Sequence, residues 1–337
     1  MFDSIEDVRS RLGAEGYICG RNIATVVYLA NRLEKPVLVE GPAGVGKTEL
    51  AKVVAAATGR ELIRLQCYEG LDEAKALYEW EYSKQLLYTQ ILKEKSSEAM
   101  AGAKTLREAA ERIGAEDSIF FSDKFIVPRP LLRAITSAKP TLLLVDEVDK
   151  SDPEFEAFLL EVLSDFQVSV PEVGTFEAKE RPLVFLTSND AREMTDALKR
   201  RCLHLWIDFP TEEEEMRILD AKVPGIEQRL AEDLVGVMQR LRKLDLKKTP
   251  SISETLDWAR ALLALNSSQI DEELVRDTLN VILKYEGDIR KAQSELGRLI
   301  VRKAEAPKPA APAAAEAEPA ATQPAAPAAP AKKGTLH

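Results

Sequence analysis

The sequence has few of the features that stabilise secreted or membrane-spanning proteins. Three cysteines occur in 337 residues (Cys19, Cys67 and Cys202), and no two of them form a CxxC pair. This spacing indicates neither a disulfide framework nor a zinc site, and it is typical of a protein from a reducing compartment. The sequence has no run of 18 apolar residues, and its N-terminus is acidic and amphipathic, unlike a signal peptide. We therefore expect a soluble, cytoplasmic protein that makes no use of a membrane.

The chain also lacks an excess of positive charge. Lys and Arg total 46 against 56 Asp and Glu, so the formal net charge is −10 and the pI is about 5.1. Proteins that bind a nucleic-acid backbone depend on clustered Lys and Arg side chains. The charge balance therefore argues against nucleic acid as the main partner, although it leaves room for a local basic patch. The length allows two domains with hydrophobic cores.

A phosphate-binding loop is the most informative feature that is present. Residues 41–48 read Gly-Pro-Ala-Gly-Val-Gly-Lys-Thr and fit the pattern GxxxxGK[ST]. The apolar run 36–39 before the loop is typical of a strand, and the segment Glu49–Thr58 after it is typical of a helix. Glycines let backbone N–H groups close around a polyphosphate, Lys47 neutralises the outer phosphates, and Thr48 offers a hydroxyl to Mg²⁺. The residues expected to bind the nucleotide are Gly41, Pro42, Ala43, Gly44, Val45, Gly46, Lys47, Thr48 and Glu49.

Alternating strand and helix patterns extend from Val37 to about Ile207. Several expected strands are continuous apolar runs, as in parallel strands that are covered on both faces. We therefore expect an α/β fold with a parallel five-stranded sheet and flanking helices. The expected strands are Val37–Glu40, Leu62–Gln66, Thr141–Val145, Leu183–Thr187 and Leu203–Ile207.

The character of the sequence changes at Pro210. Thr211, followed by Glu212 to Glu215, predicts a helix start, and helical patterns continue to about Arg302. The four glutamates are either first-turn residues favoured by the helix dipole or an acidic docking patch. The last 34 residues hold seven of the 18 prolines and almost no large apolar side chain, which predicts disorder. We expect an α/β domain at 1–210, an all-α domain at 211–303 and a disordered tail at 304–337.

An acidic pair follows the expected strand 141–145. Asp146 and Glu147 lie at the carboxyl edge, where ligands of open α/β sheets collect. In phosphate-loop ATPases the first acid holds the Mg²⁺ shell, and the second can act as general base toward the attacking water. Such a pair is common by itself, but together with the loop at 41–48 it argues against a chance Gly-rich turn. We assign Thr48 and Asp146 to the metal and Glu147 to catalysis.

Two further elements lie near the later strands. Asn189 follows the expected strand 183–187, where its amide can lie beside the γ-phosphate and orient water, or where it simply ends the strand. Arg200 and Arg201 precede the last expected strand. An arginine there can act as a finger that stabilises transition-state charge on the ATP of a neighbouring subunit, or it is a solvated helix end.

In this order the four elements resemble the AAA+ ATPase module. The stretches GPAGVGKTELAK, LLLVDEVDKSDPEFEAFLLEVLSD and LTSNDAREMTDALKRRC are similar to the MoxR family of AAA+ proteins. The run LIRLQCYEGLDEAKALYEW resembles the branch associated with maturation of carbon-monoxide-dehydrogenase-type molybdenum enzymes. The resemblance covers roughly residues 20–265 and implies a P-loop NTPase domain followed by a small helical lid.

The resemblance also implies an activity and partners. It implies a ring, usually hexameric, that hydrolyses ATP with Mg²⁺ at subunit interfaces. It further implies a partner with a von Willebrand factor A domain and a client metalloenzyme that is remodelled or loaded with its metal or cofactor. By position, the family's motifs are matched by Lys47 and Thr48 (Walker A), Asp146 and Glu147 (Walker B), Asn189 (sensor 1), and Arg201 or, second, Arg200 (arginine finger).

The resemblance leaves two positions open. Gln66 lies where family members couple the nucleotide state to substrate loops. Many relatives carry a sensor 2 arginine early in a lid helix, whereas the matching stretch 251–258 has none. Arg260, further along, is a candidate substitute.

Two inserted segments have open interpretations as well. The first carries aromatic rings that serve either an interface or the packing of an inserted helix. The second, residues 166–176, alternates like a β-hairpin, which either approaches the pore of a ring or is merely structural. The aromatic residues of the first segment are Tyr68, Tyr78, Trp80, Tyr82 and Tyr88.

We expect a Mg²⁺-dependent ATPase that remodels a protein client. Two alternatives remain. A nucleic-acid-directed motor with the same module is disfavoured by the acidic charge. A regulatory nucleotide switch or scaffold with little turnover is disfavoured by the intact Asp146–Glu147 pair and favoured by the missing sensor 2 arginine.

Overall fold

The computed structural model of this chain describes residues 2–87, 90, 125–171 and 173–300. Tyr88 and the tail predicted at 304–337 lie outside the described residues. Residues Met1–Ile300 form one compact unit, and the division of this unit after residue 210 stays a prediction. No helix among the described residues is both long enough and apolar enough to span a membrane.

A five-stranded parallel sheet forms the centre of the α/β part, with the strand order β2-β5-β8-β1-β9. The three inner strands, β5, β8 and β1, are buried along their whole length, which explains their continuous apolar sequences. The predicted fold class is confirmed, and each predicted strand agrees with the structure to within one residue at either end. The strands are β1 (Val37–Glu40), β2 (Glu61–Gln66), β5 (Thr141–Asp146), β8 (Leu183–Ser188) and β9 (Leu203–Trp206).

Helices cover both faces of this sheet. Because successive side chains of a strand point to opposite faces, each inner strand contributes to two separate clusters. Val37 and Val39 belong to the cluster that contains residues of α1, α2 and α3, whereas Leu38 belongs to the one that contains residues of α4, α7 and α8. These helices are α1 (Ile5–Ala14), α2 (Arg21–Leu33), α3 (Lys47–Thr58), α4 (Glu73–Leu77), α7 (Pro130–Thr136) and α8 (Pro153–Asp165), with a 3₁₀ turn η2 (Val148–Lys150) and α9 (Asp196–Arg201) beside them.

The segment after residue 211 is helical in all of its described elements. Its apolar residues form a third cluster, with Trp258 fully buried among leucines and valines. The indole Nε1 of Trp258 donates to the Thr278 hydroxyl at 2.9 Å, so its polar atom is satisfied in the core. The helices are α10 (Glu212–Lys222), α11 (Gln228–Leu241), α12 (Ile252–Ala264), α13 (Glu272–Ile282), α14 (Glu286–Ser294) and α15 (Leu296–Leu299).

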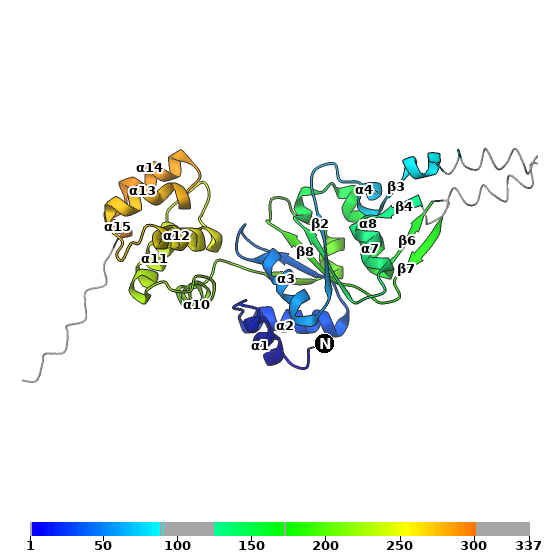
Figure 1. The fold of residues 1–337 in the computed structure, drawn as a ribbon, viewed down its shortest axis with the longest axis horizontal. Coiled ribbons are helices and arrows are strands. Elements are labelled where there is room, and N and C mark those ends of the chain that lie inside the picture. Colours follow the sequence, from blue (N-terminus) through cyan, green and yellow to red (C-terminus); the bar gives the residue numbers. More distant parts are fainter. Residues whose placement is uncertain (1, 88–89, 91–124, 172, 301–337) are drawn as a thin grey trace, which may run out of the picture. The chain divides into compact units, whose positions relative to one another are not determined.

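Each of the two inserted segments contributes to a two-stranded β-ribbon in the structure. The predicted hairpin is present as β6 (Gln167–Val170) paired with β7 (Gly174–Glu177), separate from the main sheet (Figure 1). The aromatic segment, for which either an interface or the packing of an inserted helix was expected, contains α4, the strand β3 (Tyr78–Trp80), which pairs with β4 (Ile126–Pro128), and helical residues at 82–87. Its Tyr78 and Trp80 rings meet edge to face at 5.8 Å and pack against the core, so these two serve packing. Tyr68 and Tyr82 are exposed.

The glutamates at the start of α10 differ in their burial and in their contacts. Thr211 and Glu214 form a reciprocal capping box, as the first-turn interpretation predicts. Glu215 differs from both interpretations, because its side chain is fully buried. Its carboxylate accepts two bonds of 2.6 Å from Arg242 and one of 2.5 Å from the Thr255 hydroxyl. Glu215 is therefore part of a buried ion pair in the helical core.

This buried pair makes a testable contribution to stability. In Glu215→Gln, Arg242 loses its counter-charge without leaving the core, and we expect the free energy of unfolding to fall by about 3–5 kcal/mol. Urea denaturation measures the loss. The matched control is Glu212→Gln, an exposed residue of the same turn, which should change stability by less than about 0.5 kcal/mol. Equal losses in the two variants would contradict the prediction.

A candidate nucleotide-binding site

The glycine-rich loop between β1 and α3 is closely surrounded by other backbone and side-chain atoms. Gly41 has φ 146°, and a Cβ there would lie 1.9 Å from the carbonyl oxygen of Ile207. Gly44 has φ 78°, and a Cβ there would lie 2.1 Å from the Ser251 Oγ. Any larger residue would clash at each of these two positions, so both require glycine. The loop leads into the N-terminus of α3, whose first N–H groups have no partner within the helix and are suited to phosphate.

Lys47, the first residue of α3, lies across this loop. Its Nζ donates to the carbonyl oxygens of Gly41 at 2.7 Å and Pro42 at 2.6 Å. Burial lowers the pKa of Lys47 from 10.5 to about 8, against the opposing effect of nearby carboxylates. The ammonium group is thus held inside the loop, where a phosphate would meet it.

Oxygen atoms of Thr48 and Asp146 meet beside the loop. The Thr48 hydroxyl donates to Asp146 Oδ1 at 2.9 Å, and the Thr187 hydroxyl donates to the same oxygen at 2.5 Å. Asp146 is buried. A hydroxyl and a carboxylate are the hard oxygen donors that Mg²⁺ prefers. This donor set fits the metal, and Thr48 and Asp146 would hold it; their assignment to the metal stays a prediction.

Glu147 follows Asp146 in the left-handed conformation, with φ 57°. Its backbone N–H donates to the Thr187 hydroxyl at 2.9 Å. Gln66 Nε2 and Lys150 Nζ donate to its Oε2 at 2.8 and 2.6 Å, and the hydrogen bond that Lys150 donates to this carboxylate raises the pKa of Lys150. Asn189 Nδ2 lies 3.4 Å from its Oε1. The structure therefore brings Glu147, Asn189 and Gln66 together at one edge of the sheet.

Asp149 fixes the turn that carries Asn189. Its Oδ2 accepts the backbone N–H groups of Asn189 at 3.1 Å and Ala191 at 3.2 Å. Asp190 between them has φ 59°. The sequence motifs give no role to Asp149 or Thr187, although each lies within three residues of a predicted site residue. Their roles depend on β5 and β8 being neighbours, which local sequence does not specify.

The two candidate finger residues lie apart from this cluster. Arg200 and Arg201 are exposed at the end of α9. The Arg201 guanidinium donates to the Leu160 carbonyl and the Ser164 hydroxyl, both on α8. A finger acts on the nucleotide of another subunit, so this assignment stays a prediction.

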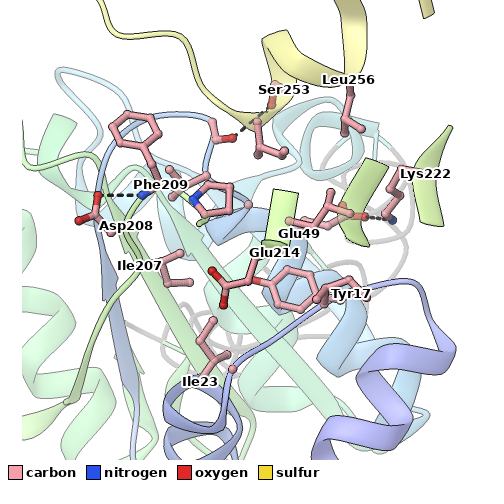
Figure 2. A pocket seen from close by; sticks show the side chains of 18 of the residues that line it. Tyr17, Ile23, Glu49, Ile207, Asp208, Phe209, Glu214, Lys222, Ser253 and Leu256 are labelled. Atoms are coloured by element: carbon pink, nitrogen blue, oxygen red, sulfur yellow. Dashed lines mark hydrogen bonds and ion pairs between the residues drawn. The ribbon is translucent and has the colours of Figure 1, made fainter. Parts of the chain in front are cut away.

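A cavity of about 510 Å³ adjoins the loop and is lined by its Gly44, Val45 and Gly46. Figure 2 shows Tyr17, Ile23, Ile207, Phe209 and Leu256 around this space. Its volume lies in the range of small-molecule sites, and its mixture of apolar and few polar groups is typical of them. Burial raises the pKa of Tyr17 well above its usual value, so the hydroxyl stays neutral.

The helical part of the chain completes the wall of this cavity. Ser253 Oγ on α12 donates to the Gly44 carbonyl oxygen at 3.4 Å, and Lys222 on α10 pairs with Glu49 at 3.4 Å (Figure 2). Glu49, predicted to bind nucleotide, therefore faces the cavity. Arg260 also lines it, and its guanidinium bonds to Asp257 at 3.1 Å. Its sensor 2 role stays a prediction.

Part of this sequence is similar to proteins of known family. Residues 36–202 match the AAA domain of the dynein-related subfamily. Lon protease from Nitratidesulfovibrio vulgaris is 45% identical over 78 residues, which are 21% of this chain and 10% of the relative. This chain therefore spans about a tenth of the length of that curated relative.

The sequence identity to solved structures is lower. The Thermotoga maritima RuvB Holliday junction branch migration motor has a TM-score of 0.43 and 16% identity, with 82% of this chain and 71% of that chain covered. A mutant of the same RuvB has a TM-score of 0.44 and 17% identity, with 83% and 71% covered. The family match shows that the chain carries an AAA+ ATPase domain; AAA+ ATPases bind ATP with Mg²⁺ and typically assemble as rings.

The lowered pKa of Lys47 predicts a pH dependence of nucleotide binding. Only the protonated ammonium attracts phosphate, so affinity should fall, by at most about tenfold per pH unit, as the pH rises through about 8. A lysine with a pKa of 10.5 would keep its charge over this range. Fluorescence titration with an ATP analogue from about pH 6.5 to 9.5 measures the effect. Lys47→Arg, which stays charged, should bind with an affinity that does not change with pH; a wild-type profile equally flat would contradict the prediction.

Proposed function

We propose that this AAA+ ATPase hydrolyses ATP with Mg²⁺ and uses the cycle to remodel a protein client. One observation carries the proposal: Lys47, the Thr48–Asp146 pair and Glu147 converge at one edge of the sheet, beside a cavity of about 510 Å³. A phosphate-binding loop, a metal-binding oxygen pair and a candidate base are the parts that phosphoryl transfer to water needs.

The chain's own groups divide the chemistry among them. Bound ATP and Mg²⁺ supply the phosphoanhydride bond and the charge that neutralises its oxygens. Lys47 and the N–H groups at the start of α3 bind the phosphates. The Glu147 carboxylate accepts a proton from the attacking water, and the Asn189 amide, 3.4 Å from that carboxylate, orients the water. The apolar cavity wall takes the base and ribose.

The finer part of the proposal concerns assembly and biological role. We assign the chain to the MoxR family and to its molybdenum-hydroxylase branch, on the motifs quoted above. It would act in the cytoplasm as a hexameric ring, with a von Willebrand A domain partner and a client metalloenzyme. The exposed Arg200 and Arg201 at the end of α9 support a subunit interface there.

A second candidate function is a nucleotide switch with little turnover. One observation favours it for the single subunit: both Gln66 and Lys150 donate to Oε2 of Glu147. A base engaged in this way is less free to accept a proton from water. Phosphate release from the purified wild-type chain, alone and with a partner, distinguishes a switch from a working ATPase.

Glu147→Gln tests the catalytic assignment. The amide keeps the shape of the side chain but cannot take the proton, so we expect turnover to fall by about 10²–10⁴-fold while ATP still binds. Phosphate release and nucleotide titration measure the two effects separately. Glu177→Gln, an exposed residue of β7, is the matched control and should leave turnover unchanged. Normal hydrolysis by Glu147→Gln would show that another group is the base.

Arg201→Ala tests whether the site is shared between subunits. If each arginine serves a neighbouring site, a mixture of Arg201→Ala with Glu147→Gln, each inactive alone, should regain turnover, because an Arg201→Ala subunit beside a Glu147→Gln neighbour then has both a base and an arginine. The same mixture with Arg200→Ala distinguishes the two candidates. Because Arg201→Ala also loses two hydrogen bonds to α8, its Tm is measured separately, which shows whether the substitution destabilises the subunit itself. No gain of turnover in either mixture would remove the finger role.

A further inference from the structure

Arg64, on the outer strand β2, reaches into the site although the sequence motifs give it no role. Its register partner on β5 is Leu144, and Gln66, two residues later, pairs with Asp146. Arg64 and Gln66 project from the same face of the strand, because side chains alternate. The Arg64 side chain is 48% exposed, whereas that of Asp146 is 3% exposed. A half-solvated cation thus lies against a buried carboxylate.

The contacts of Asp146 are divided between its two oxygens. Oδ1 accepts the hydroxyls of Thr48 and Thr187. Oδ2 accepts two bonds from Arg64, at 3.0 Å from Nε and 2.5 Å from Nη2. The carboxylate predicted to hold the metal therefore already has a cation on one oxygen.

Gln66 extends this contact to Glu147. The same Arg64 Nη2 donates to Gln66 Oε1, and Gln66 Nε2 donates to Glu147 Oε2 at 2.8 Å. An amide has one accepting end and one donating end. If the amide turned over, its NH₂ would face the guanidinium and its oxygen would face the carboxylate. Arg64 therefore fixes the orientation in which Gln66 holds Glu147.

We propose that Arg64 is a positioning residue that joins the metal-binding Asp146 to Gln66 and keeps both carboxylates in a resting arrangement until metal and nucleotide are loaded. The inference rests on the proposed function and adds a regulatory contact to that site. Two consequences follow. The first is that Arg64 competes with the metal for Asp146. The second is that Gln66 loses its contact with Arg64 when Arg64 leaves Asp146 Oδ2, and Gln66 can then release Glu147.

The first experiment compares Arg64→Met with wild type in full-length protein. We expect the MgCl₂ concentration that half-saturates binding of a fluorescent ATP analogue to fall by about two- to fivefold, because the competing, partly solvated cation is gone. Arg133→Met is the matched control, since it removes an exposed ion pair to Glu61 at the other end of β2 and should not shift the value. An unchanged magnesium dependence in Arg64→Met would overturn the inference.

Thermal unfolding separates competition from a merely structural role. Without magnesium, Arg64→Met leaves the buried Asp146 without its cation, so its Tm should fall below that of wild type. With saturating MgCl₂ and ATP analogue, the difference should shrink, because the metal then takes over the charge. An equal loss of Tm in both conditions would show that Arg64 only stabilises the fold.

A mutant cycle with Gln66→Ala tests the link to Glu147. Both single variants should raise basal turnover, and Arg64→Met should add nothing in the Gln66→Ala background while still lowering the magnesium requirement. Independent, additive effects on turnover would overturn the link. If wild type itself bound no ATP analogue at any magnesium concentration, the proposed function would fall; if it bound normally and only the Arg64 effects were missing, this inference alone would fall.

Discussion

The arrangement of the site depends on the buried carboxylate of Asp146. A carboxylate removed from water must be paired or hydrogen-bonded, or its desolvation would destabilise the fold. Each of its partners comes from a different element: Thr48 from α3, Thr187 from β8 and Arg64 from β2. The strands β2 and β8 flank β5 because the sheet has the order β2-β5-β8, and α3 packs on one face of that sheet. The need to satisfy one buried charge thus ties the phosphate loop to both neighbouring strands.

The same strand order explains what the sequence could and could not predict. The strands were predictable because the inner ones are buried on both faces and so require continuous apolar runs, as in 141–146. The loop was predictable because its glycines and Lys47 have a fixed spacing. The contacts of Arg64, Asp149 and Thr187 were not, since they join segments about 40 or 80 residues apart that meet only across the sheet. Local sequence carries no signal for such pairs.

Glu215 illustrates a second limit. Four consecutive glutamates follow Thr211, and a first-turn preference applies equally to all of them. Which one is buried depends on how α10 packs against α11 and α12, where Arg242 and Thr255 face it. Side-chain packing between distant helices decides this, and the sequence of α10 alone does not encode it.

Two strained residues flank the site, and both are held by neighbours. Glu147 and Asp190 have positive φ, a conformation that costs a residue other than glycine about 1–3 kcal/mol. The N–H of Glu147 is fixed by Thr187, and the turn around Asp190 is fixed by Asp149. The fold thus maintains a strained backbone at the two places that orient the candidate base, Glu147, and the amide of Asn189, which we propose orients water. This is the arrangement expected of a preorganised site.

The helical part of the chain is linked to the cavity beside the loop by a comparable buried charge. Arg242 is held by Glu215, and its guanidinium lies 5.5 Å from the centre of the Phe209 ring, which lines the cavity. Ser253 on α12 reaches the carbonyl of Gly44 in the loop. A ligand that filled the cavity would therefore contact residues of α10 and α12 as well as the loop. Because packed elements respond as units, we propose that a change in the occupancy of the cavity moves the helical part of the chain.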